Sequence, residues 1–186
     1  DILLYAMGRL DRKCFKQVMH RAALGNRLSA EKAQLLVNSF ACRILENHVY
    51  PQAHQQLLAE RSGGSTVWIA TAAPQLYAQI IGDRLSVDHV VATRNVWAGD
   101  CLTPLIDGEN CYGEAKLRAI CAALRKRNID RDRTRVRFYS DDISDLPTFE
   151  WADEPIAVNP SRGLRRVAID REWPILDWRH TTTAPR

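Results

Sequence analysis

Residues 136–147 read Val136-Arg137-Phe138-Tyr139-Ser140-Asp141-Asp142-Ile143-Ser144-Asp145-Leu146-Pro147. The first four are predicted to form a strand, and three carboxylates and two hydroxyls follow it within six residues. Open parallel sheets bind their ligands beyond the carboxyl ends of the strands, and a hard cation such as Mg2+ selects carboxylate oxygens. The stretch therefore predicts a cation site. The alternative is a plain helix start, where acids interact favourably with the helix dipole.

Strands and helices alternate on either side of this stretch. Three further strands are predicted, at 66–70, 89–91 and 155–158. Helices are predicted from near Pro74, over 113–128, through 146–149 and from Ser161. This succession is typical of a mostly parallel sheet covered by helices, so the predicted fold class is α/β.

The N-terminal part of the chain is predicted to be helical. Apolar residues recur at three- and four-residue steps from Asp1 to about His48. Gly25-Asn26 marks a turn between two helices, and Ser29 is placed to cap the second. We therefore expect a helical part over 1–49, an α/β part over 50–178 and a tail over 179–186.

Two more polar residues stand where strands end and helices begin. Thr71 follows the strand predicted at 66–70, where its hydroxyl could hold a phosphate oxygen next to a helix N-terminus. Lys116 falls in the first turn of the helix predicted over 113–128, at the positive end of the helix dipole. The dipole disfavours a lysine there, so a functional reason for its presence is worth considering. The alternatives are a threonine that satisfies its own turn and a solvated lysine.

The charge pattern gives little support to a nucleic-acid partner. The 26 basic residues exceed the 22 acidic ones by only four, which fits an anionic ligand without requiring one. Arginines cluster at 125–137, but Asp130 and Asp132 interrupt the run and no aromatic platform is interleaved. We predict a solvated turn there and no nucleic-acid binding.

The remaining composition is that of a cytoplasmic protein without a membrane span. The five cysteines contain no Cys-x-x-Cys pair, which favours a reducing compartment, and the five histidines are scattered rather than spaced as metal ligands. No apolar run is long enough to cross a bilayer.

Taken in order, these stretches resemble the later motifs of the haloacid dehalogenase superfamily, in its phosphoserine-phosphatase-like branch with an early helical cap. Val67-Trp68-Ile69-Ala70-Thr71 is similar to the second motif, Gly113-Glu114-Ala115-Lys116 to the third and Ser140 to Pro147 to the fourth. The resemblance covers nearly the whole chain. It implies a Rossmann-like mostly parallel sheet with a helical cap.

The resemblance also implies a role for each of these residues. Thr71 would bind the transferring phosphoryl group, Lys116 would neutralise charge between nucleophile and phosphate, Asp141 would bind Mg2+ and Asp145 would support the site. The activity implied is hydrolysis of a small phosphorylated substrate. The cap would select the leaving group, with Arg9, Arg12 and Arg43 as candidates or as plain surface residues.

The sequence departs from the family at the nucleophile. Family members carry an Asp-x-Asp signature at the end of a first strand, and no predicted strand of this sequence ends in such a pair. We therefore expect the nucleophile upstream of Asp1, in a longer polypeptide. The alternative is a catalytically inactive module that binds a phosphorylated ligand. A smaller departure is Ser140, where the family often has glycine.

Overall fold

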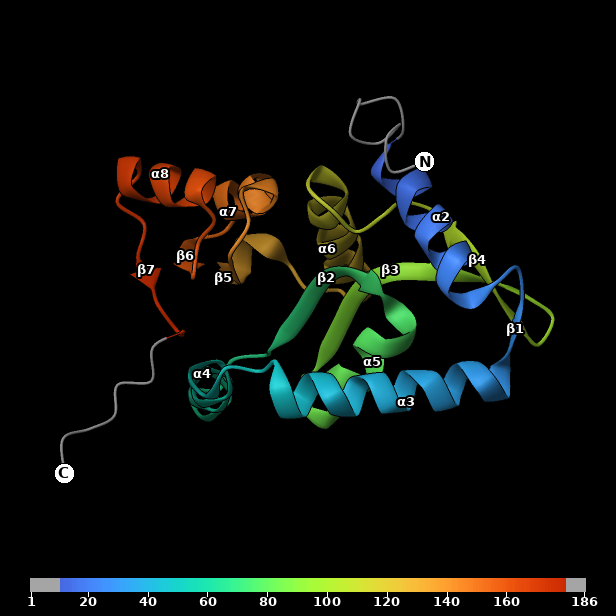
Figure 1. Cartoon of the computed structure of the whole chain (residues 1–186). Helices are drawn as coiled ribbons and strands as arrows, with labels where there is room; N and C mark the ends of the chain where they lie inside the picture. Colours follow the sequence, from blue (N-terminus) through green and yellow to red (C-terminus); the bar gives the residue numbers. More distant parts are fainter. Residues whose placement is uncertain (1–10, 180–186) are drawn as a thin grey trace. The chain divides into compact units, whose positions relative to one another are not determined.

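A computed structural model describes residues 11–179 and divides the chain into two compact units. The first unit contains the residues up to His48 together with Val67–Cys111, and the second contains Val49–Thr66 together with the residues from Tyr112 on. The elements of each can be followed in Figure 1. The division into parts at 1–49 and 50–178 stays a prediction, and residues 180–186 of the expected tail lie outside the described part.

The first unit is built on a sheet with the strand order β1-β4-β3-β2. Its strands are β1 (Leu28–Ser29), β2 (Trp68–Pro74), β3 (His89–Ala98) and β4 (Cys101–Asp107). Strand β2 pairs with β3 in parallel, whereas β3 with β4 and β4 with β1 are antiparallel. The pairing of β2 with β3 becomes irregular between Thr71 and Pro74, so the backbone leaves the regular ladder just where Thr71 lies.

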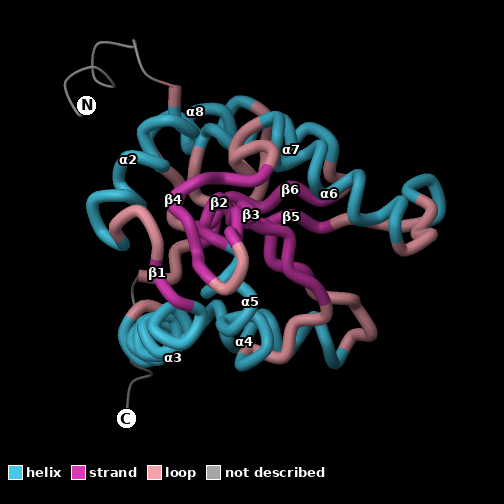
Figure 2. Tube along the Cα trace, turned by 90° about the vertical axis from the view of Figure 1, so that its right-hand side faces the viewer, coloured by secondary structure: helices cyan, strands magenta, loops and turns pink. Residues whose placement is uncertain are grey.

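Within residues 11–179, the first unit also contains the helices α2 (Arg12–Leu24), α3 (Ala30–Asn47) and α5 (Gln75–Arg84). Figure 2 shows α3 and α5 on the same side of β2 and β3. Helix α3 buries Ala33, Val37 and Ala41, which the 3.6-residue period places on one face. As predicted, Ser29 caps α3 by accepting a hydrogen bond from the amide of Lys32 at 3.5 Å, and Gly25 ends α2 at a φ of 72°.

The second unit contains a parallel sheet with the order β5-β6-β7. Its strands are β5 (Arg137–Ser140), β6 (Glu154–Val158) and β7 (Ile175–Leu176), and its helices are α4 (Pro51–Ser62), α6 (Glu114–Lys126), α7 (Leu146–Trp151) and α8 (Arg162–Asp170). Single helical turns lie at Arg131–Arg133 and Ile143–Asp145. The fully buried core consists of Phe149, Ala157, Leu164 and Ala168.

The α/β prediction is confirmed, and β5 and β6 lie within one residue of their predicted places. The prediction was wrong over 92–107, where no strand was expected and the structure has a β3–β4 hairpin. Gly99 at a φ of 58° forms its turn, and Pro104 lies inside β4. In a sequence, a proline and a glycine this close together indicate a loop. The exposed Trp97 in addition breaks the alternation of buried apolar and exposed polar residues that predicts a strand. None of the helices over 11–179 combines the length and apolar character that crossing a bilayer requires.

Candidate active site

A buried ion pair joins the predicted third and fourth motifs in the second unit. Lys116 is only 7% exposed and Asp145 only 4%, and the Lys116 ammonium lies 2.6 Å from both carboxylate oxygens. Gly113, at a φ of 56°, begins helix α6 so that Lys116 falls in its first turn. The solvated-lysine alternative is therefore wrong. A buried ammonium is stable only beside a compensating charge.

The Asp145 carboxylate is also held by the end of strand β5. The Ser140 hydroxyl donates to Oδ2 at 2.6 Å, while the buried Oδ1 lies 2.6 Å from the Lys116 ammonium. Asp142 accepts from the amide of Ser144 at 2.9 Å and begins the turn that carries Asp145. The acids of this loop thus have separate tasks, one capping a turn and one neutralising a lysine.

Asp141 differs from both of its acidic neighbours. Its side chain is exposed, and its carboxylate forms no hydrogen bond or ion pair within residues 11–179. Its backbone carbonyl accepts from the amide of Ser161 at 2.7 Å, which fixes the loop at the carboxyl end of β5. A free carboxylate on a fixed backbone is suited to bind a cation.

The residues present fit Mg2+ as a shared ion. Among the described residues no three acidic, histidine or cysteine side chains converge as a metal site. Mg2+ commonly takes only one or two carboxylates from the protein, together with substrate phosphate and water. Asp141 would supply one such carboxylate, whereas the buried Asp145 is paired with Lys116.

Thr71 lies in the first unit, inside β2 rather than after it. Its hydroxyl oxygen accepts a hydrogen bond from the amide of Ala73 at 3.1 Å, as the turn alternative predicts. The hydroxyl proton has no acceptor in the described part of the chain, so it remains free to bind a ligand oxygen. The approach of Thr71 to Lys116 and Asp141 stays a prediction.

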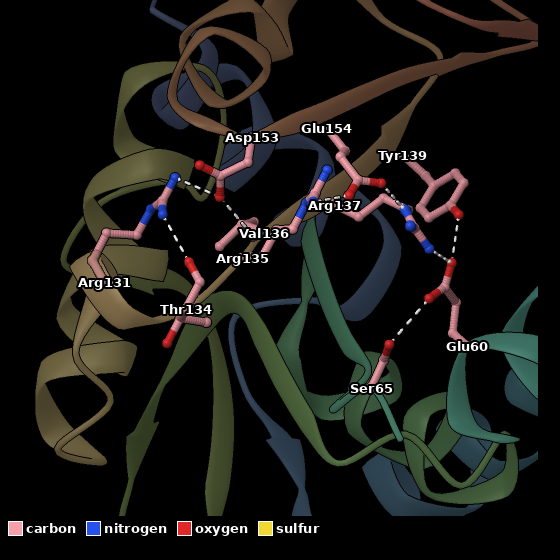
Figure 3. Close-up of polar contacts among 10 residues, drawn as sticks. All are labelled: Glu60, Ser65, Arg131, Thr134, Arg135, Val136, Arg137, Tyr139, Asp153 and Glu154. Carbon is pink, nitrogen blue, oxygen red and sulfur yellow. Dashed lines mark hydrogen bonds and ion pairs between the residues drawn. The ribbon is translucent and has the colours of Figure 1, made fainter. Parts of the chain in front are cut away.

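The sequence analysis missed a polar network that holds β5 against α4 (Figure 3). Glu60 Oε1 accepts from Tyr139 Oη at 2.7 Å and from the Arg137 guanidinium at 2.6 Å. Gln56 donates to the same oxygen at 3.0 Å. Arg137 also donates to Glu154 on β6 at 2.5 Å. Tyr139 directly precedes Ser140, so the network anchors the strand that leads into the acidic loop.

This network perturbs the acidity of its members. Partial burial alone would raise the pKa of Glu60, but hydrogen bonds from Tyr139, Arg137 and Gln56 outweigh it and lower this pKa to about 2. Burial, together with the Glu60 carboxylate, raises the pKa of Tyr139 to about 12. The depressed pKa of Glu60 means that its ionised form stabilises the folded chain.

Replacing Glu60 with Gln should therefore lower the free energy of unfolding by about 1 kcal/mol at pH 7, a modest value because Arg137 is partly solvent-screened. The contribution of Glu60 is fully present above its unfolded pKa of 4.5 and is lost as the pH falls toward 2. In urea unfolding, the difference between wild type and variant should shrink between pH 5 and pH 2.5, roughly the range that these two pKa values bracket. The control is Glu46→Gln, which changes an exposed carboxylate. If the difference in free energy of unfolding between wild type and Glu60→Gln did not change with pH, the depressed pKa of Glu60 would be contradicted.

The arginines of the 125–137 run are partly used within the chain. Arg131 pairs with Asp153 at 2.9 Å and donates to the carbonyl of Thr134 (Figure 3). It also donates to the carbonyl of Trp151. Arg135 pairs with Glu154 at 2.5 Å. These contacts give part of the cluster a structural role that the solvated-turn interpretation did not include, and the prediction of no nucleic-acid binding stays a prediction. Of the cap arginines, Arg9 lies outside the described residues, and Arg12 and Arg43 are exposed.

Comparison with known proteins decides the family. Residues 1–150 match the family described as haloacid dehalogenase-like hydrolases. This chain belongs to that family. The resemblance drawn from its motifs is thereby confirmed, because the match spans the second, third and fourth motifs in order.

Individual relatives of this haloacid dehalogenase-like chain include bacterial phosphatases. It is 35% identical over 136 residues to the "Inhibition of morphological differentiation protein" of Streptomyces azureus. The aligned region covers 73% of this chain and 48% of that protein. It is 26% identical over 143 residues to a phosphoserine phosphatase of Mycobacterium tuberculosis, covering 77% and 46%. The chain thus spans about half the length of these curated relatives.

A solved structure shows the same fold. The crystal structure of a Bordetella pertussis protein of unknown function superposes with a TM-score of 0.87 at 24% identity, over 95% of this chain and 79% of that one. The haloacid dehalogenase-like fold is therefore established for this chain.

Proposed function

We propose that this chain forms part of a Mg2+-dependent phosphatase that hydrolyses small phosphomonoesters. The observation that carries the proposal is the buried Lys116–Asp145 pair beside the free carboxylate of Asp141, at the carboxyl end of β5. An ammonium group in a site that excludes water stabilises developing negative charge better than a hydrated ammonium does. The family membership supports the same activity.

Phosphoryl transfer asks the protein chiefly for positioned donors and charge. In the proposed site the Thr71 hydroxyl donates to a phosphoryl oxygen, and the Lys116 ammonium neutralises another. Asp145, together with Ser140, holds the lysine in place. Asp141 would hold Mg2+, which supplies further neutralisation of the phosphate oxygens when bound.

The nucleophile in this proposal is an aspartate outside residues 1–186. Its carboxylate oxygen forms a bond to phosphorus as the bond from phosphorus to the leaving alkoxide breaks, and an acid protonates that alkoxide. Water then attacks the aspartyl phosphate, releases inorganic phosphate and restores the carboxylate. The Asp-x-Asp string of this sequence, Asp130-Arg131-Asp132, lies in a helical turn and not at the end of a first strand. Together with the coverage of about half of the curated relatives, this supports an outside nucleophile.

The proposed setting is the cytoplasm. All five cysteines are free thiols, which is compatible with a reducing compartment. The relative named phosphoserine phosphatase supports a small phosphorylated metabolite as the substrate class.

The test is Mg2+-dependent release of phosphate from p-nitrophenyl phosphate by the complete natural polypeptide. We expect turnover that stops on chelation by EDTA and returns with added Mg2+. A folded polypeptide that binds inorganic phosphate without any turnover would instead support the inactive phospho-ligand-binding module.

Replacing Thr71 with Val should weaken phosphate binding and lower kcat/KM by about tenfold to a hundredfold, the loss expected for one hydrogen bond to a charged group. Valine keeps the shape but removes the hydroxyl. Thr71→Ser, which keeps the hydroxyl, is the matched control and should retain most of the activity. Equal activity of the Val and Ser variants would remove Thr71 from the site.

A further inference from the structure

Lys16 on helix α2 carries a half-buried ammonium group. Its Nζ contacts three neutral oxygens: the Ala72 carbonyl, Asn110 Oδ1 at 3.0 Å and Thr93 Oγ1 at 3.4 Å. It forms no ion pair with any residue over 11–179. Burial lowers the pKa of Lys16, in keeping with a site that solvates the ammonium poorly. Placing a charge there costs free energy, so a compensating task is expected.

The Ala72 carbonyl is held from two sides. Besides Lys16, the Thr93 hydroxyl donates to it at 2.7 Å. Thr93 is completely buried and also accepts from the amide of Cys111 at 3.1 Å, so this second donor is itself immobile. The peptide group between Ala72 and Ala73 is therefore fixed at its carbonyl end.

The N–H end of the same peptide group contacts Thr71. Its N–H belongs to Ala73 and donates to the Thr71 hydroxyl oxygen at 3.1 Å. Because the C=O and N–H of a trans peptide are coplanar and point in opposite directions, fixing the Ala72 carbonyl also fixes the Ala73 N–H. A cation on the carbonyl in addition polarises the peptide and strengthens the N–H as a donor. The Thr71 oxygen is thus held as an acceptor, and its proton is left to donate elsewhere.

We infer that Lys16 is a positioning residue for Thr71: through the Ala72–Ala73 peptide it orients the Thr71 hydroxyl to donate to the phosphoryl group of the substrate. The inference rests on the proposed function and goes beyond it, since it assigns a task to a helix that precedes the motifs. All of the residues in this relay belong to the first unit.

Lys13 provides a matched control on the same helix. Its ammonium donates to the Gly108 carbonyl at 2.5 Å and so also ties α2 to the sheet region, but it does not contact Ala72. Lys16→Met and Lys13→Met each remove one lysine–carbonyl tether from α2. Only Lys16→Met interrupts the relay to Thr71.

The first experiment follows the Ala73 amide by 15N–1H NMR in the ligand-free complete polypeptide. Lys16→Met should shift this resonance upfield, as expected for a weakened donor, whereas Lys13→Met should leave it in place. An unchanged Ala73 resonance in Lys16→Met would overturn the inference whatever the protein catalyses.

The second experiment measures binding of inorganic phosphate by titration calorimetry in a double-mutant cycle. Lys16→Met should weaken binding about tenfold in the wild type and have almost no further effect in the Thr71→Val background, because the two residues act as one unit. Lys16→Arg should recover part of the loss. Additive effects would contradict a relay through Thr71. A wild type that binds no phosphate, with the NMR shift still present, would refute the proposed function and leave only the structural relay.

Discussion

Replacing Asp141 with Asn is expected to lower Mg2+-dependent turnover at least a hundredfold, because several kcal/mol of transition-state stabilisation depend on a held cation. The carboxylate of Asp141 is exposed and forms no contact with other described side chains. Its removal should therefore leave the fold intact. The apparent affinity for Mg2+, measured as the concentration that gives half-maximal turnover, should fall together with kcat.

The control for Asp141 is Asp170→Asn at the end of α8 in the same unit. Asp170 is also exposed and has no hydrogen bond or ion pair in the described part of the chain. It should keep full activity and the same Mg2+ dependence. Unchanged turnover in Asp141→Asn would remove this residue from the metal site, and a loss of thermal stability in that variant would show a structural role instead.

Replacing Lys116 with Met is expected both to abolish turnover and to destabilise the chain by about 3 kcal/mol. The structural cost arises because Asp145 would remain 4% exposed with only Ser140 to stabilise its charge. Equilibrium unfolding in urea measures this cost, with phosphate release measured in parallel below the midpoint.

A second substitution separates the two roles of Lys116. In Lys116→Met with Asp145→Asn the buried charge is gone, so most of the lost stability should return. Activity should stay lost, because no ammonium faces the phosphate. Recovery of both stability and activity in the double variant would show that Lys116 serves only to neutralise Asp145.

Local sequence patterns were sufficient for strands β5 and β6 and for helices α6 and α8 of the second unit, but not for the short strand β7. Strand β5 and helix α6 follow from short apolar runs and from Gly113, and the acids after β5 mark the end of that strand. They were insufficient for the β3–β4 hairpin. Its ladder is antiparallel and half exposed, and Pro104 within β4 is a residue that usually interrupts a sheet.

The candidate site was only partly visible in the sequence. Lys116 and Asp145 were chosen through a resemblance, and the structure adds that they form one buried pair although 29 residues separate them. The Glu60 and Lys16 contacts bridge 77 and 56 residues, respectively, and no local pattern indicates them. Such contacts depend on how α4 and α2 pack, which a period of apolar residues does not specify.

A crystal structure of the complete natural polypeptide grown with Mg2+ and inorganic phosphate tests the central claim most directly. We expect phosphate bound by the Thr71 hydroxyl and the Lys116 ammonium, and Mg2+ held by the Asp141 carboxylate. Phosphate and Mg2+ bound away from these side chains, or Thr71 held too far from Lys116 to share one phosphate, would contradict it.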